Sequence, residues 1–236
     1  MDTYPRAVVI VSGGDAISPF TTPTQACGWG QAAGSTDSGL RQALLAAGHA
    51  VFTSPANAGP GAAVEDPGFA GFAEAPEVLA PELTVNAVGP IDDAGVALAA
   101  FLTHLAEHYA VSSVDLVGHS MGGLFSRAAI RELSVTGSGP RIRSLITVGT
   151  PWQGSFTADY ANGDLPLAAA GGDRGTETIM TEFKKLKEAS SSGAGEQVTR
   201  RYLADPGGWN DQQAGVLDGV PVTLIGRPAP TPMFMW

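Results

Sequence analysis

The feature that most constrains this sequence is a five-residue segment, 118–122, together with the patterns on either side of it. The segment reads Gly-His-Ser-Met-Gly and matches G-x-S-x-G, but a chain with 31 glycines would contain roughly 0.3 such matches by chance. Its context is more specific. A strand-like run at 113–117, which contains Val114, Leu116 and Val117, precedes it, and a helix-compatible run at 124–133 follows it. The sequence therefore predicts a strand, a tight turn carrying the serine, and a helix.

Acyl-transfer chemistry accounts for each residue type in this turn. A serine presented on a strained turn requires neighbours with almost no side chain, and Gly118 and Gly122 meet that requirement around His119 and Ser120. The amide of Met121 opens the following helix, so we expect it to donate to a developing oxyanion. We interpret Ser120 as a catalytic nucleophile. The alternative is a glycine-rich turn with an incidental serine.

The rest of the chain alternates between strand-like and helix-like patterns, which predicts an α/β fold with a mostly parallel sheet and helices on both faces. The expected strands are 7–11, 50–53, 113–117, 141–148 and 220–225, and the expected helices are 37–47, 92–109 and 124–133. On helix 92–109, we expect Val96, Ala99, Leu102, Leu105 and Tyr109 to form the apolar face.

Two stretches of the chain show no sustained strand pattern. Residues 55–81 are rich in Pro, Gly and Ala and are expected to be irregular. Residues 155–219 are polar and Gly-rich with an amphipathic piece at 177–189, whose run of Lys and Glu predicts a solvated helix face. We predict one domain over 1–236, with 155–219 as the insertion where a lid would lie.

The sequence resembles the lipases and esterases of the α/β-hydrolase superfamily. The resemblance is carried by Gly-His-Ser-Met-Gly-Gly at 118–123 and by Thr-Val-Gly-Thr-Pro-Trp-Gln-Gly-Ser at 147–155. It implies an α/β-hydrolase fold and an acyl pocket lined by Pro151 and Trp152. Many of those lipases have His where Trp152 stands, so this position departs from the pattern.

The resemblance also implies a second oxyanion donor in the loop after the first strand. Those lipases have a His-Gly pair there, whereas this chain has Ser12-Gly13. By register the donor would be the amide of Gly14, with Asp15 as the alternative. Because a backbone group is used, the changed side chain leaves the donor available.

The superfamily places its triad in the order serine, acid, histidine, with the acid after the strand that here spans 220–225. No Asp or Glu follows Asp218 and no His follows His119. We therefore expect the acid and the histidine beyond Trp236, and we do not expect His49, His104, His108 or His119 to replace them.

The resemblance implies a serine hydrolase that cleaves carboxylic esters, of triacylglycerol or another small or lipid acyl ester, through a Ser120 acyl-enzyme. Three other activities on the same machinery stay open, namely acyl transfer, thioester hydrolysis and amide hydrolysis. A hydrolase-fold binding protein that has lost its triad is a further alternative.

No cofactor or metal is predicted. His104 and His108 belong to an H-x-x-E-H pattern that puts both imidazoles on one helical face, but no third ligand can be identified. The polar side of an amphipathic helix explains them as well.

Composition limits the partners. The formal charge of −10 disfavours nucleic acid and anionic membrane surfaces, and we find neither an apolar stretch long enough for a stable membrane anchor nor a signal-peptide pattern. Cys27 is the single cysteine, which excludes an intramolecular disulfide, and we expect it to be buried. The resemblance to lipases favours secretion, and the sequence predicts no oligomeric state.

Overall fold

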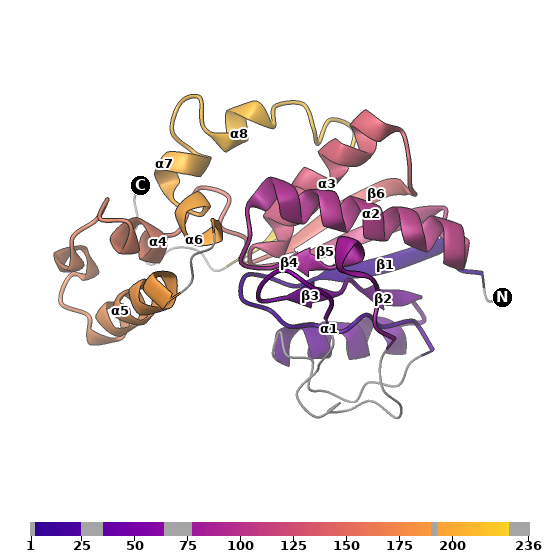
Figure 1. The fold of residues 1–236 in the computed structure, drawn as a ribbon, viewed down its shortest axis with the longest axis horizontal. Helices are drawn as coiled ribbons and strands as arrows, with labels where there is room; N and C mark the ends of the chain where they lie inside the picture. Colours follow the sequence, from indigo (N-terminus) through magenta and orange to yellow (C-terminus); the bar gives the residue numbers. More distant parts are fainter. Residues whose placement is uncertain (1–2, 25–34, 64–76, 190–192, 227–236) are drawn as a thin grey trace.

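The computed structural model describes residues 3–24, 35–63, 77–189 and 193–226 and contains a five-stranded sheet (Figure 1). Strand order across the sheet is β2-β1-β5-β6-β7, and all four neighbouring pairs are parallel. The strands are β1 (Arg6–Val11), β2 (Val51–Thr53), β5 (Ser113–His119), β6 (Arg141–Val148) and β7 (Val222–Ile225). The predicted parallel α/β fold is confirmed, with strands within two residues of their expected bounds. Cys27 lies outside the described residues.

Helices cover both faces of this sheet, and strand β1 shows why. Ala7, Val9 and Val11 join the hydrophobic cluster that contains α2 (Ile91–Tyr109) and α3 (Gly122–Thr136). Val8 and Ile10 point to the other face, where they pack with leucines of α1 (Ser35–Ala46). Because side chains alternate along a strand, a run that is apolar at every position is buried on both sides.

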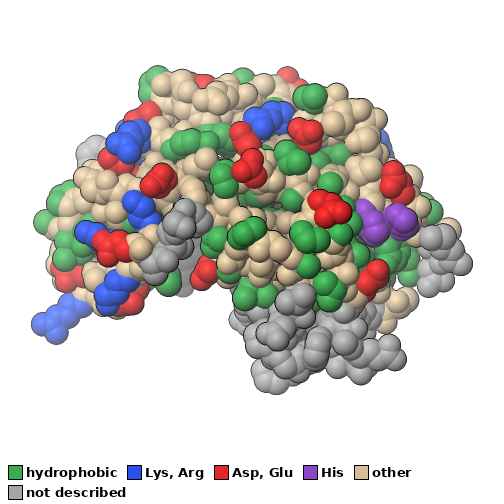
Figure 2. All heavy atoms as spheres, in the orientation of Figure 1, with side chains coloured by type: hydrophobic (Ala, Val, Ile, Leu, Met, Phe, Trp, Pro, Cys, Tyr) green, Lys and Arg blue, Asp and Glu red, His purple; other side chains and the backbone are tan. Residues whose placement is uncertain are grey.

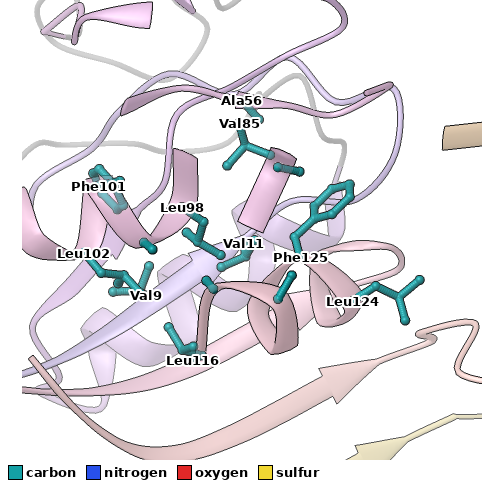
Figure 3. Packing of buried hydrophobic residues seen from close by; sticks show 14 of the residues in the cluster. Val9, Val11, Ala56, Val85, Leu98, Phe101, Leu102, Leu116, Leu124 and Phe125 are labelled. Carbon is teal, nitrogen blue, oxygen red and sulfur yellow. The ribbon is translucent and has the colours of Figure 1, made fainter. Parts of the chain in front are cut away.

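The larger cluster lies between the sheet and helices α2 and α3, as Figure 3 shows. Leu98 and Leu102 of α2 are fully buried over Val9 and Leu116. The predicted apolar face of α2 is wrong at one position, because Val96 is 51% exposed. The buried stripe instead includes Ile91, Ala94, Leu98 and Phe101, so the helix is rotated about its axis relative to the prediction.

Strand β1 occupies the point where the chain reverses its direction across the sheet. From β1 the chain passes through α1 to β2 on one side, whereas β5, β6 and β7 follow one another on the other side. In parallel sheets, ligands bind in the crevice outside the carboxyl ends of the strands at such a switch point. Here these ends are Val11 of β1 and His119 of β5, whose strands are paired up to Val11 and Gly118.

A second, two-stranded parallel sheet was not predicted. It pairs β3 (Ala56–Asn57) with β4 (Val85–Asn86), and a short 3-10 helix, η1 (Pro81–Leu83), precedes β4. The expectation of irregular structure across 55–81 is therefore wrong at β3 and at the start of η1. The part of this segment at 64–76 lies outside the described residues.

Between β6 and β7 the chain forms one long helix, α5, and several short ones beyond the sheet (Figure 1). They are α4 (Phe156–Ala161), η2 (Leu167–Ala170), α5 (Arg174–Ala189), α6 (Ala194–Gln197), α7 (Arg200–Leu203) and α8 (Trp209–Gln212). Figure 2 shows blue Lys and Arg side chains gathered over this part of the molecule, with red acidic side chains among them. Lys185 pairs with Glu182 and Lys184 with Glu188 on α5, so the predicted solvated charge run is confirmed.

None of the helices in the described residues is long and apolar enough to cross a membrane. The strand β7 forms one edge of the sheet, and Leu224 and Ile225 are more than half exposed on it.

Candidate active site

Ser120 lies on the turn that joins β5 to α3, in a conformation that few residues with a side chain adopt. Its φ is +52°, in the left-handed region, where a Cβ comes close to the backbone. The Ser120 amide donates to the carbonyl of Val148 at 2.8 Å, and its carbonyl accepts from Thr150 Oγ1 at 2.8 Å. Both main-chain groups of the strained residue are therefore held by the segment at the end of β6.

The two glycines of the predicted elbow are required by close backbone contacts. A Cβ on Gly118 would lie 2.5 Å from the amide nitrogen of Gly123, and one on Gly122 would lie 2.2 Å from the carbonyl oxygen of Val11. Neither backbone group can rotate away as a side chain would. The first turn of α3 thus packs directly on the ends of β5 and β1, as the sequence pattern predicted.

The loop after β1 approaches the serine from the other side. A Cβ on Gly13 would lie 2.6 Å from Ser120 Cβ and 3.2 Å from its Oγ, and one on Gly14 would lie 2.8 Å from Met121 Sδ. Backbone alone can come this close. The structure thus brings Gly14 beside the elbow, which is where the sequence expected a second oxyanion donor.

Three amides near Ser120 differ in their hydrogen bonding. The Asp15 amide donates to the carbonyl of Ala87 at 3.4 Å. The amides of Gly14 and Met121 donate no backbone hydrogen bond to any described residue. This distinction favours Gly14 over Asp15 as a donor for a bound oxyanion. Met121 also precedes the first turn of α3, where the helix dipole places partial positive charge.

Thr150 is a site residue that the sequence reasoning did not single out. Besides bonding the Ser120 carbonyl, its side chain fills the space over Gly123, where a Cβ would lie 2.3 Å from Oγ1. The sequence predicts only a pocket-lining role for the Gly-Thr-Pro segment. Thr150 is the fourth residue of the 147–155 segment that carries the resemblance, so the sequence did contain a signal for it.

Pro151 and Trp152, the predicted pocket residues, are half-buried and follow Thr150 directly. The indole Nε1 of Trp152 donates to Thr147 Oγ1 at 3.3 Å, and the Trp152 carbonyl accepts from Asn210 Nδ2 at 2.7 Å. Its ring packs against the larger hydrophobic cluster. These contacts fix the loop after β6, while the role of Trp152 in an acyl pocket stays a prediction.

Arg127 of α3 connects that loop to α8. Its guanidinium carbon lies 5.8 Å from the ring centre of Trp152 and 5.5 Å from that of Trp209, and Nη1 donates to Asn210 Oδ1 at 2.9 Å. Nη2 donates to the carbonyl of Gln213 at 2.9 Å. Burial lowers the pKa of Arg127, but the group stays charged at neutral pH. This cluster ties the helical segment to the core beside the site.

His119 turns to a buried carboxylate on α1. Its Nδ1 lies 3.2 Å from Oδ1 of Asp37, whose side chain is fully buried. The contact with the Asp37 carboxylate raises the pKa of His119 above its ordinary value, and partial burial opposes that rise. The imidazole therefore contacts α1, a contact that the sequence did not predict.

The other three histidines lie at the opposite edge of the sheet. The carbonyl of Tyr109, at the end of α2, accepts from the amide of Tyr4, two residues before β1. His104 and His108 belong to this end of α2 and line a cavity of about 330 Å³ with Tyr4 and Tyr109. His49 lies beside the start of β1. None of them comes from the carboxyl end of a strand.

His104 and His108 stack on one another, with ring centres 4.3 Å apart. Burial, followed by the charge of His108, lowers the pKa of His104. Within the described ranges, no group of three or more His, Cys, Asp and Glu side chains is arranged to hold a metal ion.

Comparison with known proteins places this geometry in context. Residues 82–193, a little under half of the chain, match a family described as alpha/beta hydrolase of unknown function (DUF915). The match includes β5, the Ser120 turn, α3 and β6. A search of curated proteins gave no match.

Solved structures show the same fold. The mature form of Bacillus licheniformis lipase BlEst2 superposes with a TM-score of 0.54 at 15% identity, covering 94% of this chain and 66% of the lipase. Its propeptide form gives a TM-score of 0.50 at 15% identity, covering 94% of this chain and 35% of that one. The chain thus spans less than two thirds of the length of these similar proteins. At such identity the likeness shows the fold alone.

Proposed function

Because the chain has the α/β-hydrolase fold, we propose that it is a serine hydrolase of the lipase and esterase kind that cleaves carboxylic esters. The observation that carries the proposal is the geometry of Ser120. A residue with a side chain is held at φ +52° between β5 and α3, at the switch point of the sheet and against the Gly13-Gly14 backbone. Strain of this kind costs about 1–3 kcal/mol and clusters at functional sites.

In the proposed reaction, Ser120 Oγ attacks the ester carbonyl carbon and passes its proton to a general base. The carbonyl oxygen becomes an oxyanion, which accepts hydrogen bonds from the amides of Met121 and Gly14. Collapse of this intermediate expels the alcohol, which takes a proton, and leaves an acyl group on Ser120. Water then attacks the acyl-enzyme, releases the carboxylic acid and restores the serine hydroxyl.

The proposal assigns the remaining parts as follows. Residues 155–219 form a lid or cap over the crevice, Pro151 and Trp152 line the acyl pocket, and no cofactor is used. The acid and histidine are expected C-terminal to β7, on the superfamily order of triad residues. Small-molecule or lipid esters are the proposed substrates, and the interleaved charges of Figure 2 offer no continuous basic surface on that face to a polyanion.

A hydrolase-fold binding protein is the second candidate. It is favoured by one observation, that His49, His104 and His108 lie at the amino edge of the sheet and His119 faces Asp37. Without a base, Ser120 is an ordinary hydroxyl, and oxyanion donors with binding alone leave only about 10³- to 10⁴-fold acceleration over water.

The test is hydrolysis of short p-nitrophenyl esters by the chain and by Ser120→Ala, with Ser113→Ala as the matched control because Ser113 lies at the far end of β5. In the protein extended by the downstream genomic sequence, we expect Ser120→Ala to lower hydrolysis by orders of magnitude, to what the oxyanion donors and binding alone supply, and Ser113→Ala to retain it. Hydrolysis that persists unchanged in Ser120→Ala would contradict the assignment of the nucleophile.

A second measurement separates the two candidates. The chain and a version extended by the downstream genomic sequence are treated with a labelled fluorophosphonate, which reacts with activated serines. The enzyme predicts slow labelling that becomes faster by orders of magnitude in the extended protein, and loss of that gain when the added His is replaced by Ala. Labelling that stays slow in the extended protein would support the binding protein.

A further inference from the structure

A buried carboxylate lies behind the proposed nucleophile and contacts both segments that form the site. Asp37, in the first turn of α1, has no exposed surface. Its Oδ2 accepts a hydrogen bond from Ser12 Oγ at 2.7 Å, and its Oδ1 lies 3.2 Å from His119 Nδ1. Oδ1 has no hydrogen-bond donor among the described residues, so its contact with His119 is an ion-pair contact.

The two partners of Asp37 occupy equivalent places in the two segments. Ser12 directly precedes Gly13 and Gly14, whose backbone lies against Ser120 and Met121. His119 directly precedes Ser120. One side chain on α1 therefore holds the residue before the proposed oxyanion loop and the residue before the proposed nucleophile at once.

The hydrogen bonds fix the direction of the Ser12 hydroxyl. An ionised carboxylate only accepts, so Ser12 donates its single proton to Asp37. Ser18 Oγ, at 2.8 Å from Ser12 Oγ, must then be the donor to Ser12. Ser18 also exchanges two backbone hydrogen bonds with Ala56 of β3. The network thus continues from α1 through the loop after β1 to the small second sheet.

A fully buried carboxylate needs compensation for the water that it has lost. Ser12 supplies a hydroxyl, His119 supplies an imidazole, and the amino end of α1 supplies partial positive charge. Other charged groups nearby are directed elsewhere. Arg41, one turn along α1, donates to the carbonyls of Val51 and Thr22, and Asp15 in the loop is exposed.

We propose that Asp37 is a positioning residue of this hydrolase, whose carboxylate sets the spacing between the Gly13-Gly14 backbone and Ser120 by holding Ser12 and His119 together. The inference rests on the proposed function and deepens it. Asp37 acts through its two partners. Breaking this bridge frees the loop that carries the Gly14 amide, so stabilisation of the oxyanion weakens more than substrate binding does.

Two substitutions test separately the negative charge of Asp37 and the nitrogen donor of His119. Asp37→Asn keeps an oxygen near Ser12 but removes the negative charge, which weakens both the charge-assisted hydrogen bond from Ser12 and the contact with His119. In His119→Asn, the side-chain Nδ2 is bonded to Cγ, as Nδ1 is in histidine, so a nitrogen donor is kept. The titrating ring is removed. His108→Asn is the matched control, because it makes the same substitution at the far end of α2.

The Ser120-dependent rate of ester hydrolysis is the first readout. Loss of one fixed oxyanion donor lowers kcat by about 10²- to 10³-fold, so a donor that is loosened should lower it by about 10-fold. We expect that loss in Asp37→Asn with KM within about threefold of the original, a smaller loss of kcat in His119→Asn, which keeps a donor to Asp37, and a kcat within about threefold in His108→Asn. An unchanged kcat in Asp37→Asn would overturn the proposal, and a collapse of kcat in His119→Asn would instead make that ring a catalytic base.

Amide hydrogen exchange is the second readout and needs no activity. We expect the Asp15 and Ser18 amides, which donate to the carbonyls of Ala87 and Ala56, to exchange at least tenfold faster in Asp37→Asn than in the original protein, with exchange in the centre of α2 unchanged. Equal acceleration everywhere would show only global destabilisation and would overturn a positioning role. If Ser120→Ala retains full hydrolysis while the Asp15 and Ser18 amides respond as expected, the proposed function fails and the bridge stands.

The pH dependence of unfolding is the third readout. The pKa of His119 is raised in the folded protein, so the stability that the pair contributes is complete below the unfolded pKa of about 6.5. It is lost as the pH rises through the folded pKa. We expect this loss above pH 6.5 in the original protein and its absence in both Asp37→Asn and His119→Asn. The same pH dependence in all three proteins would contradict the contact.

Discussion

Replacement of Gly122 by alanine should destabilise the protein strongly, although alanine is the better helix former. The added Cβ would lie 2.2 Å from the carbonyl oxygen of Val11 and 2.8 Å from that of Ser12. Ordinary carbon–oxygen contacts are about 3.3 Å or longer, so the start of α3 or the end of β1 has to move by about 1 Å. Both colliding groups are backbone, and no side chain can rotate away.

Overpacking of a well-packed interior typically costs about 1–3 kcal/mol, and the upper end applies here because the backbone itself has to shift. For a chain of this length, 3 kcal/mol corresponds to a fall in Tm of about 6–12 °C. Thermal and urea unfolding measured by circular dichroism would give this difference without any substrate.

Gly39→Ala is the control, since Gly39 is an exposed position of helix α1 and a Cβ there meets nothing within 4 Å. Alanine in an exposed helix interior is favoured over glycine by about 0.5–1 kcal/mol, so Tm should rise slightly. If Gly122→Ala unfolds within about 0.5 kcal/mol of the original protein, the close packing of α3 on β1 is wrong. Opposite signs for the two variants would support it.

Two further predictions concern charged side chains outside the elbow. Arg127→Lys loses the planar group that lies over Trp152 and Trp209 and bonds α8, so we expect a loss of about 1–3 kcal/mol and a changed tryptophan emission. Arg131→Lys, whose side chain forms a half-exposed ion pair with Asp92, should lose under about 1 kcal/mol. Similar losses in both variants would contradict the role of the Arg127 cluster. Burial raises the pKa of Asp159 in the folded state, so its folded form holds its proton to higher pH and stability falls as the pH rises from about 4 towards neutral. Asp159→Asn, which keeps an acceptor for the Arg200 amide, should reduce that fall, and an unchanged pH profile of Tm would refute the assignment.

The order of the large elements was predictable because each carries its own periodicity. Strand β6 begins and ends where its alternating pattern predicted, and β1 is buried on both faces as a continuous apolar run requires. Strands β3 and β4 have two residues each, too few for a period-2 pattern to show. Val96 was misassigned because small residues on α2, among them Gly95 packed against Ala128 of α3, shift the buried stripe.

The candidate site was only partly visible in the sequence. Ser120 and its glycines form a contiguous signal, because the strained turn and the close backbone contacts are local. Asp37 gave only the signal of an acidic residue in the first turn of a helix. Its contact with His119 joins residues on different elements, far apart in the chain, and depends on how α1 lies on the sheet. No pattern within either segment could have revealed it.

The segments 118–123 and 147–155, which carried the resemblance, contact one another in the structure. The turn at Ser120 stores strain, and strain persists only where the surroundings determine the backbone from several sides. Val148 accepts from the Ser120 amide and Thr150 donates to its carbonyl, so the last residue of β6 and the segment after it hold the strained residue at both main-chain groups. The same threonine fills the space above Gly123, which keeps α3 seated on the sheet. The Gly-Thr-Pro segment therefore supports the serine mechanically, whatever surface it presents to a substrate.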